Sequence, residues 1–345
     1  MKYEAARLID ISKALGLSVS TVSRALHDSY TISEKTKKIV REYAKQINYR
    51  PNPVAVSLRE KRSRSIGVVL AEIANSFFSQ VINGIESVAH ARGYNVIITQ
   101  SLESCEREIN NINFLASRSV DGCLISVSTE TKNYDHITRL HDNGFPFVCF
   151  DRIIDELNTH KVSIDNFKGA YDATTELINS GFKRIAMLCN APQLSITTER
   201  LSGYKKALAD GGLPIDESII KYCGHGGMIY DEVAQAMDEL LSLHKKPDTL
   251  FAAADKLTTN FVRYCKTNKI KIPAKLGLVG FSNLDLTDLL SPSLSVVRQP
   301  AFDMGRIATE LLIKTIEAKR AVTDFETKVL EPELLVRESS QRKKK

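Results

Sequence analysis

The sequence has 345 residues, 43% hydrophobic and 26% charged, which is enough chain for two or three domains and excludes a fibrous or low-complexity protein. No apolar run approaches the ~18 residues that a membrane span requires. Residues 1–64 hold 14 Lys and Arg against six Asp and Glu, whereas residues 65–336 hold 28 against 34. This basic head on an acidic body predicts that only the head contacts a polyanion, either a nucleic acid or an anionic membrane surface.

The first fifteen residues lack the continuous apolar stretch of a secretory signal, so we expect a cytoplasmic protein. The six cysteines are widely spaced and mostly lie in apolar runs, which predicts buried free thiols instead of disulfides or metal ligands. The seven histidines form no zinc-binding pattern, and we predict no metal site.

The head predicts a helix-turn-helix. Leu8, Ile11 and Leu15 have helical spacing, and Gly16 can end that helix in a left-handed conformation. Ser18 then caps a second short helix over residues 19–26. A third helix is predicted to start after the capping residue Ser33, with a buried stripe consisting of Ile39, Val40, Tyr43, Ala44 and Ile47.

The outer face of the second helix suits the major groove of DNA. Arg24 can donate two hydrogen bonds to a guanine edge, and Val19 can pack on a thymine methyl group. An ordinary basic three-helix bundle is the alternative reading of the same residues. The side chains that we expect in the groove are Val19, Ser20, Thr21 and Arg24.

A short segment after the head has the features of a conditional helix. Pro53 suits a first helical turn because it lacks only an N–H that would have no partner there. The segment 53–59 is too short to form a stable helix alone in water, so we expect it to fold only against a partner.

The body alternates short apolar runs with amphipathic stretches, which predicts parallel sheets covered by helices. No Gly-x-Gly-x-x-Gly follows a predicted strand, so a dinucleotide is not indicated. The predicted strands are 66–70, 96–99, 123–127, 147–150, 185–189, 249–253 and 276–281.

Motifs along nearly the whole chain resemble the LacI/GalR family of bacterial transcription regulators. In the head these are Asp10-Ile-Ser-Lys-Ala, Ser20-Thr-Val-Ser-Arg-Ala-Leu26, Tyr49-Arg-Pro-Asn and Ala55-Val-Ser-Leu58. In the body they include Asn75-Ser-Phe-Phe78, Phe150-Asp-Arg152, Glu199-Arg200 and Arg298-Gln-Pro300. The resemblance implies an all-α helix-turn-helix head and two Rossmann-like α/β lobes with a ligand cleft between them, similar to periplasmic sugar-binding proteins.

The resemblance also implies domain boundaries. The head is expected at 1–50 and a hinge helix with its linker at 51–64. The first lobe is expected to comprise 65–161 and 292–324, and the second 162–291 and 325–340. Residues 341–345 are expected to form a basic disordered tail.

For DNA, the resemblance implies a repressor that binds a palindromic operator in double-stranded DNA as a homodimer. The tail lacks the leucine heptads that would build a tetramer. In the hinge, Leu58 is expected to wedge into the minor groove, with Ala55 and Arg59 beside it. Phosphate contacts are expected from Ser23, His27 and Tyr49. Val56 departs from the family, in which many members carry Arg.

For the effector, the expected residues follow strands, because ligands of such sheets lie at the carboxyl ends of the strands. They are Asn75, Phe77, Phe78, Asp151, Arg152, Arg200, Asp255, Ser282 and Gln299. Asp151 and Asp255 have alternative roles as caps or turn residues, and Phe77 as a core residue. The chain departs from the family at Ala254 and Ser282, where carboxamide and carboxylate groups are usual. Loss of a carboxylate favours a sugar acid or sugar phosphate as the small-molecule effector over a neutral sugar, with no other cofactor.

Two other classes fit less well. A periplasmic sugar-binding protein without a DNA role would explain the body but not the basic head. An enzyme would need a nucleophile, a base and an orienting group that converge, and the sequence contains no Gly-x-Ser-x-Gly, phosphate loop or metal set.

Overall fold

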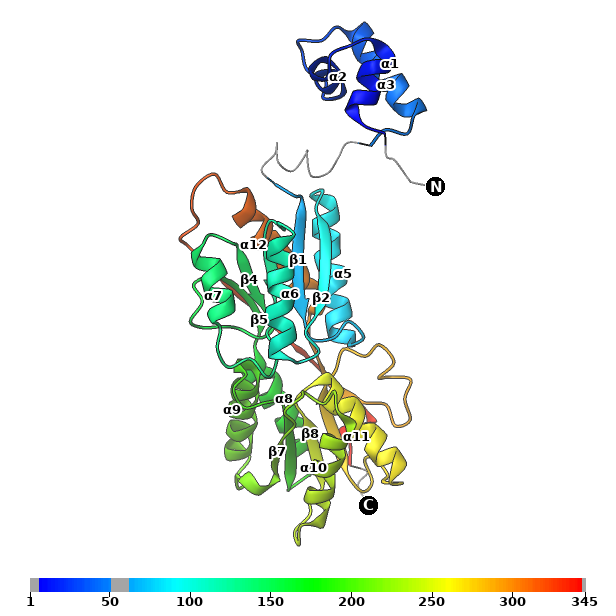
Figure 1. Ribbon diagram of the computed structural model, residues 1–345. Coiled ribbons are helices and arrows are strands. Elements are labelled where there is room, and N and C mark those ends of the chain that lie inside the picture. The colour runs from blue at the N-terminus through cyan, green and yellow to red at the C-terminus, as the bar shows by residue number, and fades with distance from the viewer. Residues whose placement is uncertain (1–5, 51–61, 343–345) are drawn as a thin grey trace. The chain divides into compact units, whose positions relative to one another are not determined.

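The computed structural model describes residues 6–50 and 62–342, which belong to two separate units, Met1–Ser63 and Arg64–Lys345. In the first unit the predicted helices are present: α1 (Leu8–Leu15), α2 (Val19–Leu26) and α3 (Glu34–Gln46) (Figure 1). Gly16 ends α1 with φ +65°, and the Ser18 hydroxyl accepts a hydrogen bond of 3.1 Å from the Thr21 N–H. The helix-turn-helix and its caps are therefore confirmed.

The head core is small, and one predicted member is wrong. Ile39 is 44% exposed, because the α3 stripe turns inward one residue later, at Val40. The aliphatic stem of Lys37 is buried instead, and its ammonium group bridges Asp28 at 3.0 Å and Glu34 at 2.7 Å. The buried hydrophobic side chains are Ile11, Val22, Ala25, Val40 and Ala44.

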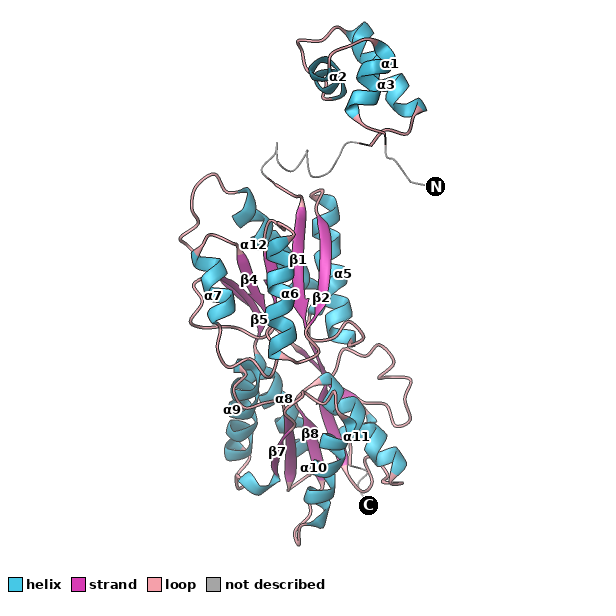
Figure 2. Ribbon diagram, in the orientation of Figure 1, coloured by secondary structure: helices cyan, strands magenta, loops and turns pink. Residues whose placement is uncertain are grey.

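The second unit contains two lobes, each built on one sheet (Figure 2). The first sheet is wholly parallel, with the strand order β11-β5-β4-β3-β1-β2. Its strands are β1 (Ser65–Leu70), β2 (Asn95–Gln100), β3 (Cys123–Ile125), β4 (Phe147–Phe150), β5 (His160–Ile164) and β11 (Thr327–Leu330). Its helices are α5 (Ser76–Ala91), α6 (Cys105–Ser117), α7 (Asp135–Asp142) and α12 (Ala301–Glu317).

The second sheet has the order β12-β10-β9-β8-β6-β7, and only the β10–β12 pair is antiparallel. Its strands are β6 (Ile185–Cys189), β7 (Ile220–Tyr222), β8 (Thr249–Ala252), β9 (Gly277–Phe281), β10 (Ser295–Arg298) and β12 (Glu333–Leu335). Its helices are α8 (Asn166–Asn179), α9 (Ser195–Asp210), α10 (Tyr230–Ser242) and α11 (Asp255–Thr267). Two single 3-10 turns, Glu217–Ile219 and Glu338–Ser340, complete the described elements.

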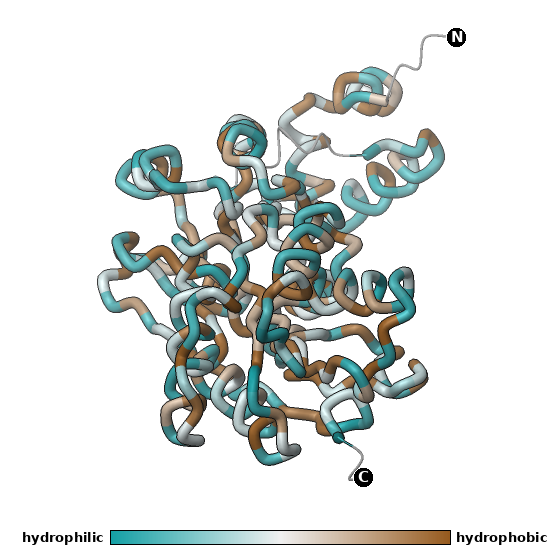
Figure 3. The backbone as a smooth tube through the Cα atoms, turned by 90° about the horizontal axis from the view of Figure 1, so that it is seen from below, coloured by the Kyte–Doolittle hydropathy of each residue, from teal (hydrophilic) through white to brown (hydrophobic). Residues whose placement is uncertain are grey.

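Successive strand residues face different helices, as a two-sided parallel sheet requires. In β1, Val68 packs in the core under α5 and α12, whereas Val69 packs under α6 and α7. In β6, Met187 faces the side of α8 and α9, and Leu188 faces α10 and α11. Hydrophilic and hydrophobic residues alternate along the outer helices in Figure 3.

The predicted lobe boundaries need correction, because the chain crosses between the lobes three times. Strand β5 pairs with β4, so the first lobe extends to Ile164 and not only to 161. Strand β10 pairs with β9, so residues 292–298 belong to the second lobe. Strand β11 pairs with β5, so residues 327–330 return to the first lobe before β12 joins the second.

The predicted disordered tail included residue 342, which the structure places on the second lobe. The Arg342 guanidinium lies 5.5 Å from the centre of the Phe182 ring and donates to the Gly181 carbonyl at 3.2 Å. Residues 343–345 of the predicted tail lie outside the described residues. In residues 6–50 and 62–342, no helix has both the length and the apolar character needed to cross a bilayer.

Candidate functional site

The candidate DNA-binding face lies on α2. Val19 is 42% exposed, and Ser20 and Arg24 are also exposed. The Arg24 Nε–H donates to the Ser20 carbonyl at 3.3 Å, which directs the guanidinium along the outer face of the helix. The Thr21 hydroxyl is half-buried and lies 2.8 Å from the Ser18 hydroxyl. Three of the four predicted groove residues are thus presented to solvent, and Thr21 is presented in part.

The other predicted DNA contacts are less uniform. His27 is exposed at the C-cap of α2, and Ser23 is half-buried. Tyr49 is half-buried against the head core, and this burial raises the pKa of its hydroxyl. The predicted hinge residues Ala55, Leu58 and Arg59 lie outside the described residues.

In the second unit, the predicted effector residues gather at the carboxyl ends of both sheets. At the end of β1, the Asn75 side chain accepts from the Phe77 N–H at 2.9 Å and caps α5. Phe77 and Phe78 are each 4% exposed and pack edge to face at 5.2 Å, and Phe78 also packs on Phe150. Both rings belong to the hydrophobic core, so the alternative role foreseen for Phe77 applies to this structure.

Arg152 follows β4 and forms a buried ion pair that the sequence did not reveal. Its two terminal nitrogens donate to the two carboxylate oxygens of Glu103 at 2.7 and 2.8 Å, and one of them also donates to the Val127 carbonyl. Burial acts to raise the pKa of Glu103, but Arg152 and the Thr129 N–H together hold it below the usual value. Glu103 is therefore ionised and neutralises Arg152.

Asp151 lies beside this pair in a turn with φ +61°, as its alternative role anticipated. It is 6% exposed, and burial raises the pKa of its carboxyl although Arg152 and Arg200 oppose the change. The Arg152 Nε lies 3.9 Å from Asp151 and has no hydrogen-bond partner among the described residues.

Arg200 is the second buried cation of the cleft. Only 3% of its surface is exposed, and its guanidinium lies 3.8 Å from the centre of the Phe281 ring. It donates to the Asn166 side chain at 2.8 Å, the Ala253 carbonyl at 2.6 Å and the Gln299 side chain at 3.1 Å. Burial lowers its pKa to about 10, because these neutral acceptors replace water only in part.

Asp255 and Ser282 form a third group. The Ser282 hydroxyl donates to the Asp255 carboxylate at 2.7 Å, and burial raises the pKa of Asp255. Where many family members have a carboxylate, this chain therefore has the Ser282 hydroxyl, and that hydroxyl already donates its hydrogen bond to Asp255. Asp255 begins α11 without a side-chain cap bond, so the alternative role as a cap does not apply.

Several polar residues of the cleft were missed by sequence reasoning: Glu103, Thr129, Asn166, Asn190 and Asn283. Thr129 Oγ1 and Asn190 Oδ1 are buried without a hydrogen-bond partner among the described residues. Asn190 and Asn283 follow the ends of β6 and β9, so the rule that selected Asp151 would have found them. Glu103 also follows a predicted strand, β2, and Asn166 follows β5, which was not predicted; the partners of both residues are set only by the tertiary structure.

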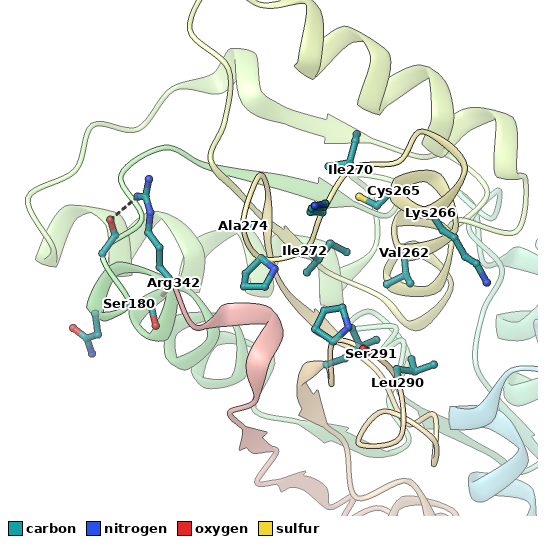
Figure 4. A pocket seen from close by; sticks show the side chains of 16 residues that line it. Ser180, Val262, Cys265, Lys266, Ile270, Ile272, Ala274, Leu290, Ser291 and Arg342 are labelled. Atoms are coloured by element: carbon teal, nitrogen blue, oxygen red, sulfur yellow. Dashed lines mark hydrogen bonds between the residues drawn. The ribbon is translucent and has the colours of Figure 1, made fainter. Parts of the chain in front are cut away.

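A surface pocket of about 1360 Å³ lies away from this cleft (Figure 4). Its lining comes from segments that precede β6, β9 and β10, including Ser180, Ile272 and Leu290, and from α11. It therefore lies at the amino edge of the second sheet, opposite the edge at which parallel sheets bind ligands. We do not assign the effector to it.

Comparison with known proteins gives two family matches that together span nearly the whole chain. Residues 7–52 match "Bacterial regulatory proteins, lacI family", and residues 63–329 match "Periplasmic binding proteins and sugar binding domain of LacI family". Catabolite control protein A of Priestia megaterium is 30% identical over 308 residues, covering 89% of this chain and 91% of the relative. The transcriptional repressor CytR of Escherichia coli K12 is 30% identical over 336 residues, covering 97% and 96%.

Solved structures agree with these matches. The cellobiose complex of the transcriptional regulator CelR is similar over 97% of this chain and 99% of that one, with a TM-score of 0.70 and 28% identity. The regulator CcpA of Lactococcus lactis matches 80% of this chain with a TM-score of 0.71 and 25% identity. A helix-turn-helix head, two parallel-sheet lobes with a polar cleft, and relatives matched from end to end place this chain in the LacI family of bacterial DNA-binding transcription regulators.

Proposed function

We propose that this regulator is a homodimeric repressor that binds a palindromic operator, acts by binding and not by catalysis, and works at the nucleoid in the cytoplasm. An anionic carbohydrate-like effector between the lobes sets its operator affinity. The observation that carries the DNA role is the exposed face of α2, where Val19, Ser20 and Arg24 lie beside the cap residue Ser18. A sugar-binding protein without a DNA role leaves this face unexplained.

Deletion of residues 1–64 tests whether the head alone binds DNA and the two lobes alone bind the effector. We expect the shortened chain to lose all DNA binding in footprinting against fragments near its own gene and to keep its effector binding in calorimetry. Retained sequence-specific footprints would contradict the DNA role, and the position of the footprints of the full chain would indicate the regulated pathway.

Arg24→Ala is expected to lower operator affinity by about 1–3 kcal/mol and to relax the preference at one base pair of each half-site, because a bidentate contact to guanine is lost. Binding to single-base variants of the footprinted operator measures this. Lys45→Ala, in the last turn of α3, is the matched control. An equal loss on every operator variant would instead make Arg24 a phosphate contact.

The effector class rests on Arg200. No carboxylate oxygen in the described parts of the chain lies within ion-pair distance of this buried guanidinium, whereas Arg152 is already neutralised by Glu103. Asp151 and Glu199 act on Arg200 only from beyond ion-pair distance, and a buried cation without a direct ion-pair partner favours an anionic ligand group. Asn75, Phe77, Phe78, Asp151, Arg152, Asp255, Ser282 and Gln299 are proposed to shape the rest of the site, with Arg200 meeting the acid or phosphate.

Calorimetry with matched ligands tests this class. For glucose and for ribose, we expect the phosphate or aldonic acid to bind at least tenfold more tightly than the neutral sugar, and Arg200→Met to remove this preference. Arg298→Met, a change of the same kind on β10, controls for general effects of the substitution. Tight binding of a neutral monosaccharide, with none of its acid or phosphate, would contradict the proposal.

We propose a homodimer because one head reads only one half-site of the operator. Two heads related by two-fold symmetry read a palindromic operator. An apolar surface supports the homodimer. In the loop between β9 and β10, Leu289 is 76%, Leu286 54% and Leu290 38% exposed. Leu290 also lines the apolar pocket of Figure 4 beside Val262 of α11. We propose that a second copy of the chain covers this leucine loop.

A further inference from the structure

The two lobes touch at one rim of the cleft through the loop that follows β3. The Gln193 side chain of the second lobe donates a hydrogen bond to the Thr129 carbonyl of this loop. His225, in the loop after β7, places its Nε2 4.0 Å from the Glu130 carboxylate. We name these contacts between residues 128–131 and the second lobe the interlobe clasp.

Two buried carboxylates hold the first-lobe side of the clasp in place. The Ser128 N–H donates to Glu108 at 2.5 Å, and the Thr131 hydroxyl donates to the same carboxylate at 3.0 Å. The Thr129 N–H donates to Glu103 Oε2 at 2.8 Å. A loop fixed by three such bonds presents Glu130 in a defined position.

Glu103 connects the clasp to the effector cleft. Its Oε2 accepts from Thr129 and also from Arg152, so one oxygen atom joins the clasp loop to a cleft cation. Glu103 and the preceding Leu102 both have positive φ, +63° and +50°. Such strained backbone is retained where the surroundings impose it, commonly at functional sites. Movement of Arg152 would therefore move the loop that grips the other lobe.

We propose that the interlobe clasp is proton-dependent: protonated His225 bridges Glu130 of the first lobe and Glu232 of the second and holds the cleft closed, while Glu103 ties this grip to Arg152. The clasp gives closure a pH dependence and, on the proposed function, makes effector response depend on intracellular pH.

The charges around His225 support this. The ring Nδ1 of His225 lies 2.7 Å from one carboxylate oxygen of Glu232 on α10. The backbone N–H of His225 donates to the other oxygen of that carboxylate at 3.2 Å. The negative charges of Glu130 and Glu103 in the first lobe also favour the protonated ring, with Glu130 at 4.0 Å. The hydrogen bond to Glu232 is the main cause that raises the pKa of His225, and the three carboxylates outweigh the opposing effect of burial.

The sign follows from this direction. Glu232 belongs to the same lobe as His225 and raises its pKa in the open state as well, so only the part of the shift caused by the first-lobe carboxylates depends on closure. That part stabilises the closed state fully below the pKa that His225 has in the open state, and it is lost as the pH rises through the higher pKa of the closed state. We therefore expect the clasp to be strongest in mildly acidic solution and to loosen above neutrality.

Titration of the histidine rings by NMR in the full chain tests the clasp without ligand or DNA. The His225 signals are assigned as those lost in His225→Asn. We expect Glu130→Gln to lower the titration midpoint of His225 by about 0.2–0.7 pH units, the range for a partly exposed ion pair. Glu106→Gln, an exposed change on α6 near the same loop, is the control and should leave the midpoint unchanged.

Amide exchange supplies the second measurement. Residues 128–131 and 225–227 should exchange more slowly at pH 6 than at pH 8, after correction for the intrinsic rates, and Glu103→Gln should remove this difference. The clasp is overturned if Glu130→Gln moves the His225 midpoint no more than Glu106→Gln does, or if the corrected exchange is independent of pH. Neither outcome depends on DNA binding or on the effector class, so the proposed function is tested separately.

Discussion

Leu289→Asp is expected to convert the proposed homodimer into monomers and to lower operator affinity by about 10²–10⁴-fold, the gain that two linked binding modules usually provide. Leu289 is the most exposed of the leucines in its loop, at 76%, and an isologous interface would place it near the same loop of the partner. A carboxylate there would have to be desolvated, and it would join Asp285 and Asp288 in repelling the second copy.

Sedimentation velocity at micromolar concentration and operator titration in a gel-shift assay measure the two effects. Val329→Asp is the matched control, because Val329 is also apolar and 58% exposed but lies on β11 of the first lobe. Dimers that persist in Leu289→Asp would refute the leucine loop as the interface. A stable tetramer of the unchanged chain would refute the dimer itself.

Gly84→Ala is expected to destabilise the first lobe by about 3 kcal/mol, at the upper end of the usual cost of overpacking. Helices α5 and α12 approach so closely that a β-carbon at Gly84 would lie 2.0 Å from the Phe302 carbonyl oxygen. A β-carbon at Gly305 of α12 would in turn lie 2.1 Å from the Val81 carbonyl. The obstacles are backbone atoms, so the helices must separate to admit even one methyl group.

The helix preference of Ala over Gly, about 1 kcal/mol, offsets only part of this cost. Calorimetric unfolding of the full chain measures the change, with Asn83→Ala on the exposed side of α5 as the control. A melting temperature equal to that of the control would show that the two helices can move apart freely. Gly203 repeats the arrangement in the second lobe, where its β-carbon would lie 2.2 Å from the Phe167 carbonyl of α8.

Strands were predictable from sequence where burial on both faces made them continuously apolar. Runs such as 66–70 and 185–189 became β1 and β6 for this reason. The strands that were missed, because polar and apolar residues are mixed in them, are β5, β7, β10, β11 and β12. Strand β11, for example, is largely exposed. Their places in the sheets come from pairing with strands far away in the chain, and this is also why the predicted lobe boundaries were wrong.

In the candidate cleft, too, some features were predictable from the sequence and others depended on contacts between distant residues. Its position followed from the carboxyl ends of strands, which a sequence can indicate. Its charge balance could not be predicted from the sequence, because Glu103 lies 49 residues from its partner Arg152 and Asn166 lies 34 residues from its partner Arg200. Without these partners, Arg152 and Arg200 look equivalent, whereas in the described parts of the chain Arg152 has a direct carboxylate partner and Arg200 has carboxylates only beyond ion-pair distance.

The sequence by itself determined the helix-turn-helix, its caps and the uneven charge of head and body, because each depends on residues within a few positions of one another or on composition alone. It also determined the family, through short motifs in order along the chain. The tertiary structure decided which strands join which lobe, which cation is neutralised and where the lobes grip each other. These features depend on contacts between distant segments, and their free energies come from burial that no local pattern records.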